Sequence, residues 1–105
     1  MNYNIVRHED VRWDLSSIYA WLALDYGERT AEAKIDRAED GIHSLATLPH
    51  FGSRRFTPRG NEYRIKVAGK AVIAFTVDDD RQEVFIVAVT YGGMDWQARV
   101  VSRLD

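Results

Sequence analysis

The chain contains no cysteine, so disulfide bonds, thiolate metal sites and a cysteine nucleophile are all excluded. Proline is scarce as well, with two residues in 105. No apolar run approaches the roughly 20 residues that a transmembrane helix needs, and the first ten residues lack the apolar core of a signal peptide. These absences predict one soluble, cytoplasmic domain over residues 1–105, without a membrane partner.

Positive charge is sparse outside one segment. The chain has 14 Lys/Arg against 16 Asp/Glu, a net charge of −2. Six of these cations lie within positions 51–70, where Glu62 is the single acidic residue. A local cationic segment on a mildly acidic chain favours one specific acidic or polyanionic partner surface. It disfavours general nucleic-acid binding, for which the whole domain is usually basic.

Sequence patterns for metal or nucleotide binding are also missing. The three histidines, His8, His43 and His50, lack metal-ligand spacing, and there is no serine nucleophile elbow or phosphate loop. The run Asp78–Asp80 is typical of a polar hairpin turn, because three consecutive carboxylates do not easily face one ion. The sequence therefore predicts no metal and no cofactor. His50, beside the basic segment, is the histidine to test.

Four stretches have the alternation or the composition of β-strands. They are residues 3–7, 62–67, 71–77 and 84–91. The last two are almost wholly apolar and rich in β-branched residues, as is typical of central strands. Ala68-Gly69 suits a two-residue hairpin loop, and residues 50–61 read as an irregular connection.

Three stretches have helical periodicity. They are residues 11–26, 30–48 and 96–104. The predicted N-caps are Asp10, Thr30 and Asp95, while Gly27 and Pro49 end the first two helices. Trp13 and Trp21 are expected in the core or between the helices. The order β-α-α-β-β-β-α predicts an α+β fold, in which a helical hairpin packs on a four-stranded, mainly antiparallel twisted sheet, followed by a short C-terminal helix.

Several short patterns occur in one order along the chain. The most specific is Ile42-x-x-Leu45-x-x-x-Pro49-x-x-Gly52-x-x-Arg55. The others are Asp14-Leu15-x-x-Ile18, Tyr63-Arg64, residues 70–75, and residues 84–91 followed by Gly92-Gly93-x-Asp95. Together they resemble the RelE/ParE toxin superfamily, the small toxins of bacterial type II toxin–antitoxin modules that are also known as plasmid stabilisation proteins.

The resemblance implies a partner and two alternative targets. The partner is a cognate antitoxin whose C-terminal segment covers the toxin, and a dimer or a heterotetramer with the antitoxin is left open. RelE-like members cut messenger RNA in the ribosomal A site without a metal, whereas ParE-like members inhibit DNA gyrase and lack the nuclease residues.

The residues at the end of the last strand distinguish between these two targets. For a RelE-like nuclease, the resemblance implies Arg55, Arg64 and Tyr91 as catalytic residues. Because no Arg or His stands at the strand end, that machinery is incomplete, and tyrosine with an ordinary pKa near 10 is a poor base. The segment from Tyr91 to Asp95 is similar to the ParE pattern His-Gly-x-Arg-Asp, with Tyr for His and Met for Arg. A ParE-like gyrase inhibitor is therefore favoured, with a RelE-like endoribonuclease and an inactive interaction module as the alternatives.

The predicted target- or antitoxin-binding residues lie in and after the basic segment. They are Arg54, Arg55, Arg59, Arg64, Lys66, Tyr91 and Trp96. The geometry of guanidinium groups suits both phosphate and carboxylate, so these cations are expected to form one surface that meets acidic antitoxin side chains or the target. The alternative is a solvated loop with Arg55 paired to a helix carboxylate. An amphipathic antitoxin segment is expected to cover apolar surface beside the helical hairpin.

Overall fold

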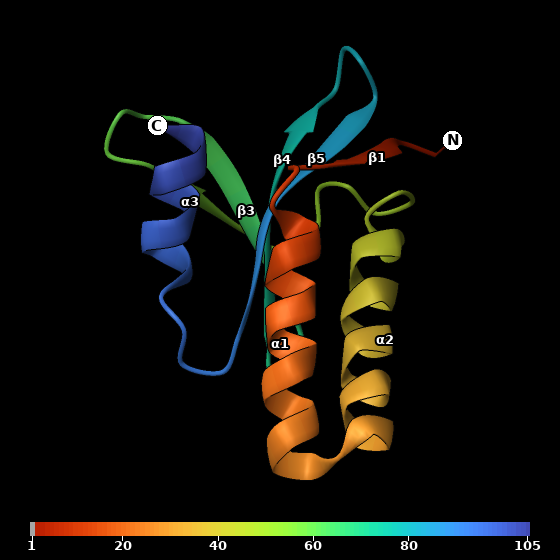
Figure 1. Ribbon diagram of the computed structural model, residues 1–105. Coiled ribbons are helices and arrows are strands. Elements are labelled where there is room, and N and C mark those ends of the chain that lie inside the picture. Colours follow the sequence, from red (N-terminus) through yellow and green to blue (C-terminus); the bar gives the residue numbers. More distant parts are fainter. Residues whose placement is uncertain (1) are drawn as a thin grey trace.

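The computed structural model describes residues 2–105 and contains three helices and five strands in that range. The helices are α1 (Val11–Tyr26), α2 (Glu28–Ser44) and α3 (Trp96–Leu104). The strands are β1 (Asn4–Arg7), β2 (Ser53–Phe56), β3 (Glu62–Ala68), β4 (Ala71–Asp78) and β5 (Glu83–Tyr91). Figure 1 shows α1 and α2 as an antiparallel hairpin, with α3 standing apart from it beside β3 and β5. The expected α+β arrangement is confirmed.

The sheet has five strands, one more than expected, in the order β1-β5-β4-β3-β2. β1 runs parallel to β5, and the other neighbouring pairs are antiparallel. The extra strand is β2, which lies within the stretch expected to be irregular. Its sequence, Ser-Arg-Arg-Phe, does not alternate between apolar and polar residues, because all four residues are exposed and no face of the strand is buried. It forms because the outer edge of β3 offers backbone donors and acceptors that β2 satisfies from Ser53↔Ile65 to Phe56↔Glu62.

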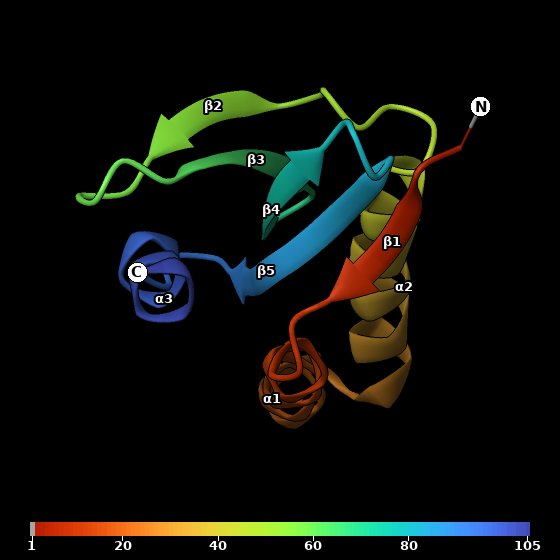
Figure 2. The same ribbon diagram turned by 90° about the horizontal axis from the view of Figure 1, so that it is seen from above.

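The two faces of the sheet bury two separate groups of side chains. Ile73, Phe75 and Val89 belong to the cluster that packs against α1 and α2. Ala74 and Ala88 belong to the second cluster, which packs against Val100 of α3. A register shift between Ala74 and Phe75 interrupts the pairing of β4 with β5. The molecule therefore has a hairpin face and an α3 face, and Figure 2 shows α1 and α3 in separate positions around β5.

The predicted bounds of α1 and α3 are confirmed, but only one predicted side-chain cap forms. Asp95 accepts a hydrogen bond from the backbone N–H of Ala98 at 3.0 Å. Asp10 makes no side-chain cap, and its own N–H donates to His8 Nδ1 at 3.0 Å. Thr30 does not cap α2 either, because the chain reverses through Gly27 alone, at φ +92°, and α2 begins at Glu28.

Two expectations about burial are wrong. Trp13 and Trp21 are 60% and 49% exposed, because Leu15 and Ile18 occupy the face of α1 that meets the sheet. The helical periodicity predicted over residues 30–48 ends with Leu48 on the buried stripe, but this side chain is 55% exposed. The helix ends at Ser44, so the periodicity no longer determines where Leu48 points.

α2 approaches the sheet closely at Gly41. A Cβ at this position would lie 2.9 Å from the Cβ of Ala68 and 2.9 Å from Cδ1 of Ile73. The adjoining hairpin loop is Gly69-Lys70, one residue later than predicted, since Ala68 pairs with Ala71. Among residues 2–105, none of the helices combines the length and apolarity needed to cross a membrane.

Candidate functional site

The predicted cations are divided between the two faces of the sheet. Arg54 lies opposite Arg64, and Arg55 lies opposite Tyr63. Because side chains alternate along a strand, Arg54 and Arg64 share the hairpin face, whereas Arg55 and Tyr63 share the α3 face. The expectation of one common surface is therefore wrong, because neighbours on an exposed strand necessarily point to opposite sides.

On the hairpin face, each of the three cations has a local partner. Arg54 Nε donates to Glu62 Oε1 at 2.6 Å, and Arg64 Nη1 donates to the backbone oxygen of His50 at 2.9 Å. The ammonium group of Lys66 lies 4.3 Å from the centre of the Phe51 ring, a cation–π contact. Their contacts hold these side chains in place at the exposed edge formed by β2 and β3.

On the α3 face, Arg55 contacts an aromatic ring. Its guanidinium lies 5.5 Å from the ring centre of Trp96, and Trp96 packs edge-on against Tyr63 at 6.3 Å. Within residues 2–105 no carboxylate pairs with Arg55, so the expected alternative of a helix ion pair does not form. Arg59 is exposed in the β2–β3 connection, where its backbone N–H donates to Asp105.

Tyr91 is 7% exposed and belongs to the hairpin-face core. It packs edge-on against Trp21, with ring centres 6.0 Å apart. Tyr91 lies opposite Ala71 at one end of β4, while Arg64 lies opposite Phe75 further along that strand. The three residues expected of a nuclease, Arg55, Arg64 and Tyr91, are therefore not brought together.

An exposed groove surrounds the Trp21–Tyr91 pair, and we call it the Trp21 groove. Two hollows share Trp21, Tyr91 and Gly92 as their common wall. The first, of about 390 Å³, is mainly apolar, and its other lining residues are Ser17, Ile18, Gly93 and Met94. The second, of about 330 Å³, is lined in addition by Leu22, Tyr26, Thr30, Lys34 and Lys70.

A buried carboxylate that sequence reasoning overlooked joins α1, β5 and α3. Asp14 is 4% exposed. Its Oδ2 accepts from Arg103 Nη1 at 2.6 Å and from the Val89 N–H at 3.0 Å, and its Oδ1 accepts from Arg103 Nη2 at 2.8 Å and from Arg99 Nη1 at 3.2 Å. The hydrogen bonds to Asp14 raise the pKa of Arg103. The signal was present, because Asp14 interrupts the buried stripe of α1 and two arginines stand four residues apart on the last helix.

The same side chains form hydrogen bonds with backbone groups of β5 that have no partner in β1. β1 ends at Arg7, and the last backbone bond to this edge of β5 runs from His8 N–H to the oxygen of Ile86. Further along the edge, Arg103 donates to the oxygen of Val87 at 2.9 Å, and Asp14 accepts from Val89. Side chains thus complete the hydrogen bonding of a strand edge that would otherwise be unpaired.

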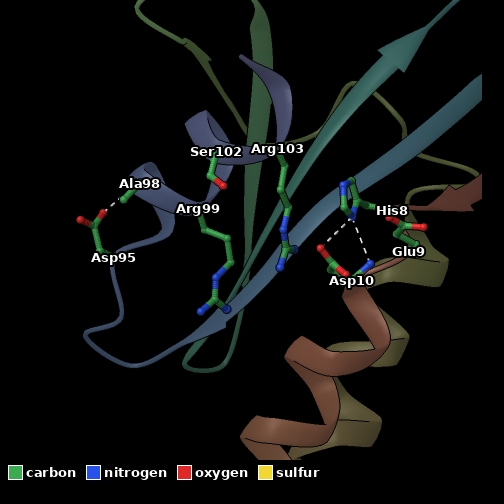
Figure 3. A pocket seen from close by; sticks show the side chains of 8 residues that line it. All are labelled: His8, Glu9, Asp10, Asp95, Ala98, Arg99, Ser102 and Arg103. Atoms are coloured by element: carbon green, nitrogen blue, oxygen red, sulfur yellow. Dashed lines mark hydrogen bonds and ion pairs between the residues drawn. The ribbon is translucent and has the colours of Figure 1, made fainter.

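An open polar cleft of about 600 Å³ separates the start of α1 from α3. Figure 3 shows Arg99 and Arg103 reaching from α3 toward the segment that contains His8 and Asp10. Both arginines are already bonded to Asp14. Because acidic groups of Glu9, Asp10 and Asp95 also line this cleft, its chemistry does not favour an anion.

His50, the histidine singled out from the sequence, contacts Asp79, the first residue of the β4–β5 turn. Its Nε2 lies 2.7 Å from Asp79 Oδ1, which also accepts from the Tyr3 hydroxyl at 2.7 Å. The hydrogen bonds from Tyr3 and then His50 lower the pKa of Asp79, and the bond to Asp79 raises the pKa of Tyr3. These contacts tie the N-terminal segment to the turn.

Residues 5–96 match a family model described as the ParE toxin of type II toxin–antitoxin systems, parDE. The chain belongs to the ParE toxin family. No curated protein sequence matches this ParE-family toxin.

Solved structures confirm the ParE/RelE fold. A structure of the chromosomal ParDE system from P. aeruginosa aligns with a TM-score of 0.70 at 15% identity, covering 86% of this chain and 96% of that one. The RelBE2 toxin–antitoxin complex from Mycobacterium tuberculosis aligns with a TM-score of 0.60 at 17% identity, covering 87% of this chain and 99% of that one. A mutant of the E. coli toxin RelE in the free state aligns with 0.65 at 10%, covering both chains fully.

Proposed function

We propose that this ParE-family toxin inhibits DNA gyrase and is neutralised by a cognate antitoxin. The observation that carries the choice of target is the separation of Arg55, Arg64 and Tyr91. Metal-free cleavage of RNA needs a base, an acid and cations around one phosphate. Here Arg55 lies on the α3 face, and Tyr91 is buried against Trp21. A toxin that acts by binding a protein needs no such constellation.

The antitoxin partner is proposed on the strength of family membership and of the exposed apolar residues. Trp21, Leu24 and Tyr26 on α1 are 49%, 87% and 63% exposed. Exposed aromatic and aliphatic side chains of this size are typical of a surface that a partner covers. The chain also resembles ParDE and RelBE2, whose structures were determined as toxin–antitoxin systems.

Induced expression in a bacterial host tests the target. We expect growth arrest with filamentation and a DNA-damage response, and inhibition of gyrase supercoiling by the purified toxin. Co-expression of the protein encoded immediately beside the toxin gene should restore growth. A gyrase that supercoils normally at saturating concentrations of folded toxin contradicts the proposal.

The two alternatives give different outcomes in the same experiment. A ribosome-dependent endoribonuclease stops translation rapidly and leaves messages cut at codons in the A site, which primer extension detects. An interaction module without toxicity leaves growth and supercoiling unchanged while it still binds the neighbouring protein. Each outcome replaces gyrase inhibition as the function of the chain.

A further inference from the structure

We propose that the Trp21 groove binds a segment of the antitoxin in which a large apolar side chain stands close to a carboxylate. This inference rests on the antitoxin pairing proposed above, and it adds the place of contact and the chemistry of the segment. The groove lies where α1 passes the end of β5 and the connection to α3, a region visible in Figure 1.

The apolar hollow offers a site for the apolar side chain. Its walls are Trp21, 49% exposed, and Met94, 38% exposed, above a floor that includes Ile18. Gly92 and Gly93 add no side chain. Apart from the two neighbouring residues in the chain, no residue between 2 and 105 has a heavy atom within 4 Å of the position of a Cβ on either glycine. A partner side chain entering here removes Trp21 and Met94 from water, the favourable contribution that anchors most protein interfaces.

The second hollow supplies charge for a carboxylate. Lys34 comes from α2 and Lys70 from the β3–β4 turn, so two elements direct cations to one place. Both lysines are exposed, and neither forms an ion pair with any residue between 2 and 105. No Asp or Glu lines either hollow, although acidic residues outnumber basic ones in the chain. This charge selects an acidic group.

A peptide fits this combination better than a nucleic acid does. A nucleic-acid strand carries a phosphate on every nucleotide, and a protein that binds it places cations at intervals along a groove. Here both cations line one hollow, and the other hollow is mainly apolar. A peptide can place an apolar side chain in one hollow and a carboxylate in the other, because the two groups can stand a few residues apart.

Charge reversal tests the carboxylate half of the proposal. The probe is the purified protein encoded beside the toxin gene, and the readout is its affinity for the toxin by titration calorimetry. We expect Lys34→Glu with Lys70→Glu to weaken binding roughly 100-fold at low salt, about tenfold for each lysine that is reversed. High salt should reduce the difference. The control is Arg81→Glu, an exposed cation in the other hairpin turn, which should change the affinity less than about twofold.

Two tryptophans on one helix test the apolar half. We expect Trp21→Ala to weaken binding roughly 30-fold, as removal of an interface anchor does. Trp13→Ala is the matched control, because Trp13 is 60% exposed on α1 but lines neither hollow. It should weaken binding less than about threefold. Thermal unfolding of each variant establishes that it is folded.

The outcomes distinguish this inference from the proposed function. If the wild-type toxin does not bind the neighbouring protein, the antitoxin pairing is wrong, and the groove assignment is overturned with it. If the wild type binds and both the Lys34/Lys70 and Trp21 variants bind equally well, only the groove assignment is overturned. A partner whose acidic residue is replaced by lysine should recover binding to the charge-reversed toxin, which identifies the contacting carboxylate.

Discussion

Asp14 connects three elements through one side chain. Its carboxylate holds Arg103 and Arg99 of α3 and the N–H of Val89 in β5, while its own backbone belongs to α1. A buried ion pair need not stabilise a fold relative to well-packed apolar residues, because desolvation offsets the attraction. Removing one partner, however, leaves charges and a backbone donor without compensation.

We therefore expect Asp14→Ala to destabilise the fold by about 3 kcal/mol, the cost of breaking a buried pair from one side. Urea denaturation measures it. Asp36→Ala, an exposed carboxylate of α2, is the control and should stay within about 0.5 kcal/mol of the wild type. Adding Arg103→Met to Asp14→Ala should cost less than the two single changes together, because the substitutions act on one contact. Additive costs would show that the pair is not coupled.

At the scale of elements, α2 lies this close to the sheet because Gly41 lacks a side chain. The Cβ of Ala68 cannot move away without its strand, whereas Cδ1 of Ile73 ends a flexible side chain. Glycine costs an α-helix about 1 kcal/mol relative to alanine. The close packing of the helix against β3 and β4 offsets this cost.

We expect Gly41→Val to destabilise the protein by about 2 kcal/mol, since overpacking forces α2 away from the sheet. Thermal or urea unfolding checks the value. The matched control is Ala33→Val, an exposed position on the same helix, which should cost no more than about 0.7 kcal/mol through helix propensity. Valine has a higher helix propensity than glycine, so propensity cannot cause a loss at position 41. A Gly41→Val protein as stable as the wild type would therefore contradict the close approach.

For the whole molecule, the division of the sheet into two faces decides which cations can act together. Arg54, Arg64 and Lys66 lie on the hairpin face at the β2–β3 edge, and Arg55 lies on the α3 face. The Trp21 groove lies at the Tyr91 end of β5, away from this edge. The proposed antitoxin groove and the cationic edge are thus separate surfaces.

Arginine substitutions on the two faces test which surface meets the target. We expect Arg54→Ala with Arg64→Ala to relieve growth arrest, because removing each charge weakens target binding about tenfold. Arg55→Ala, on the α3 face, should remain toxic. Survival after induction is the measurement, with circular dichroism to establish folding. Relief by Arg55→Ala alone would place the target contact on the α3 face.

Local patterns were sufficient for the elements that depend on neighbours in sequence. The periodicity of α1 and α3 predicts their bounds, and Asp95 caps α3 as expected, because helical hydrogen bonds and caps join residues within one or two turns. The apolar runs of β4 and β5 likewise identify the centre of the sheet.

Contacts between distant segments decided the rest. β2 exists because β3 offers it an edge. The register between these strands, which no local pattern encodes, decides that Arg54 lies on the hairpin face and Arg55 on the α3 face. Asp14 is a binding partner only once α3 returns to it from the far end of the chain. The identity of the elements is a local property, whereas the grouping of charges into surfaces depends on strand pairing and helix packing across the whole molecule.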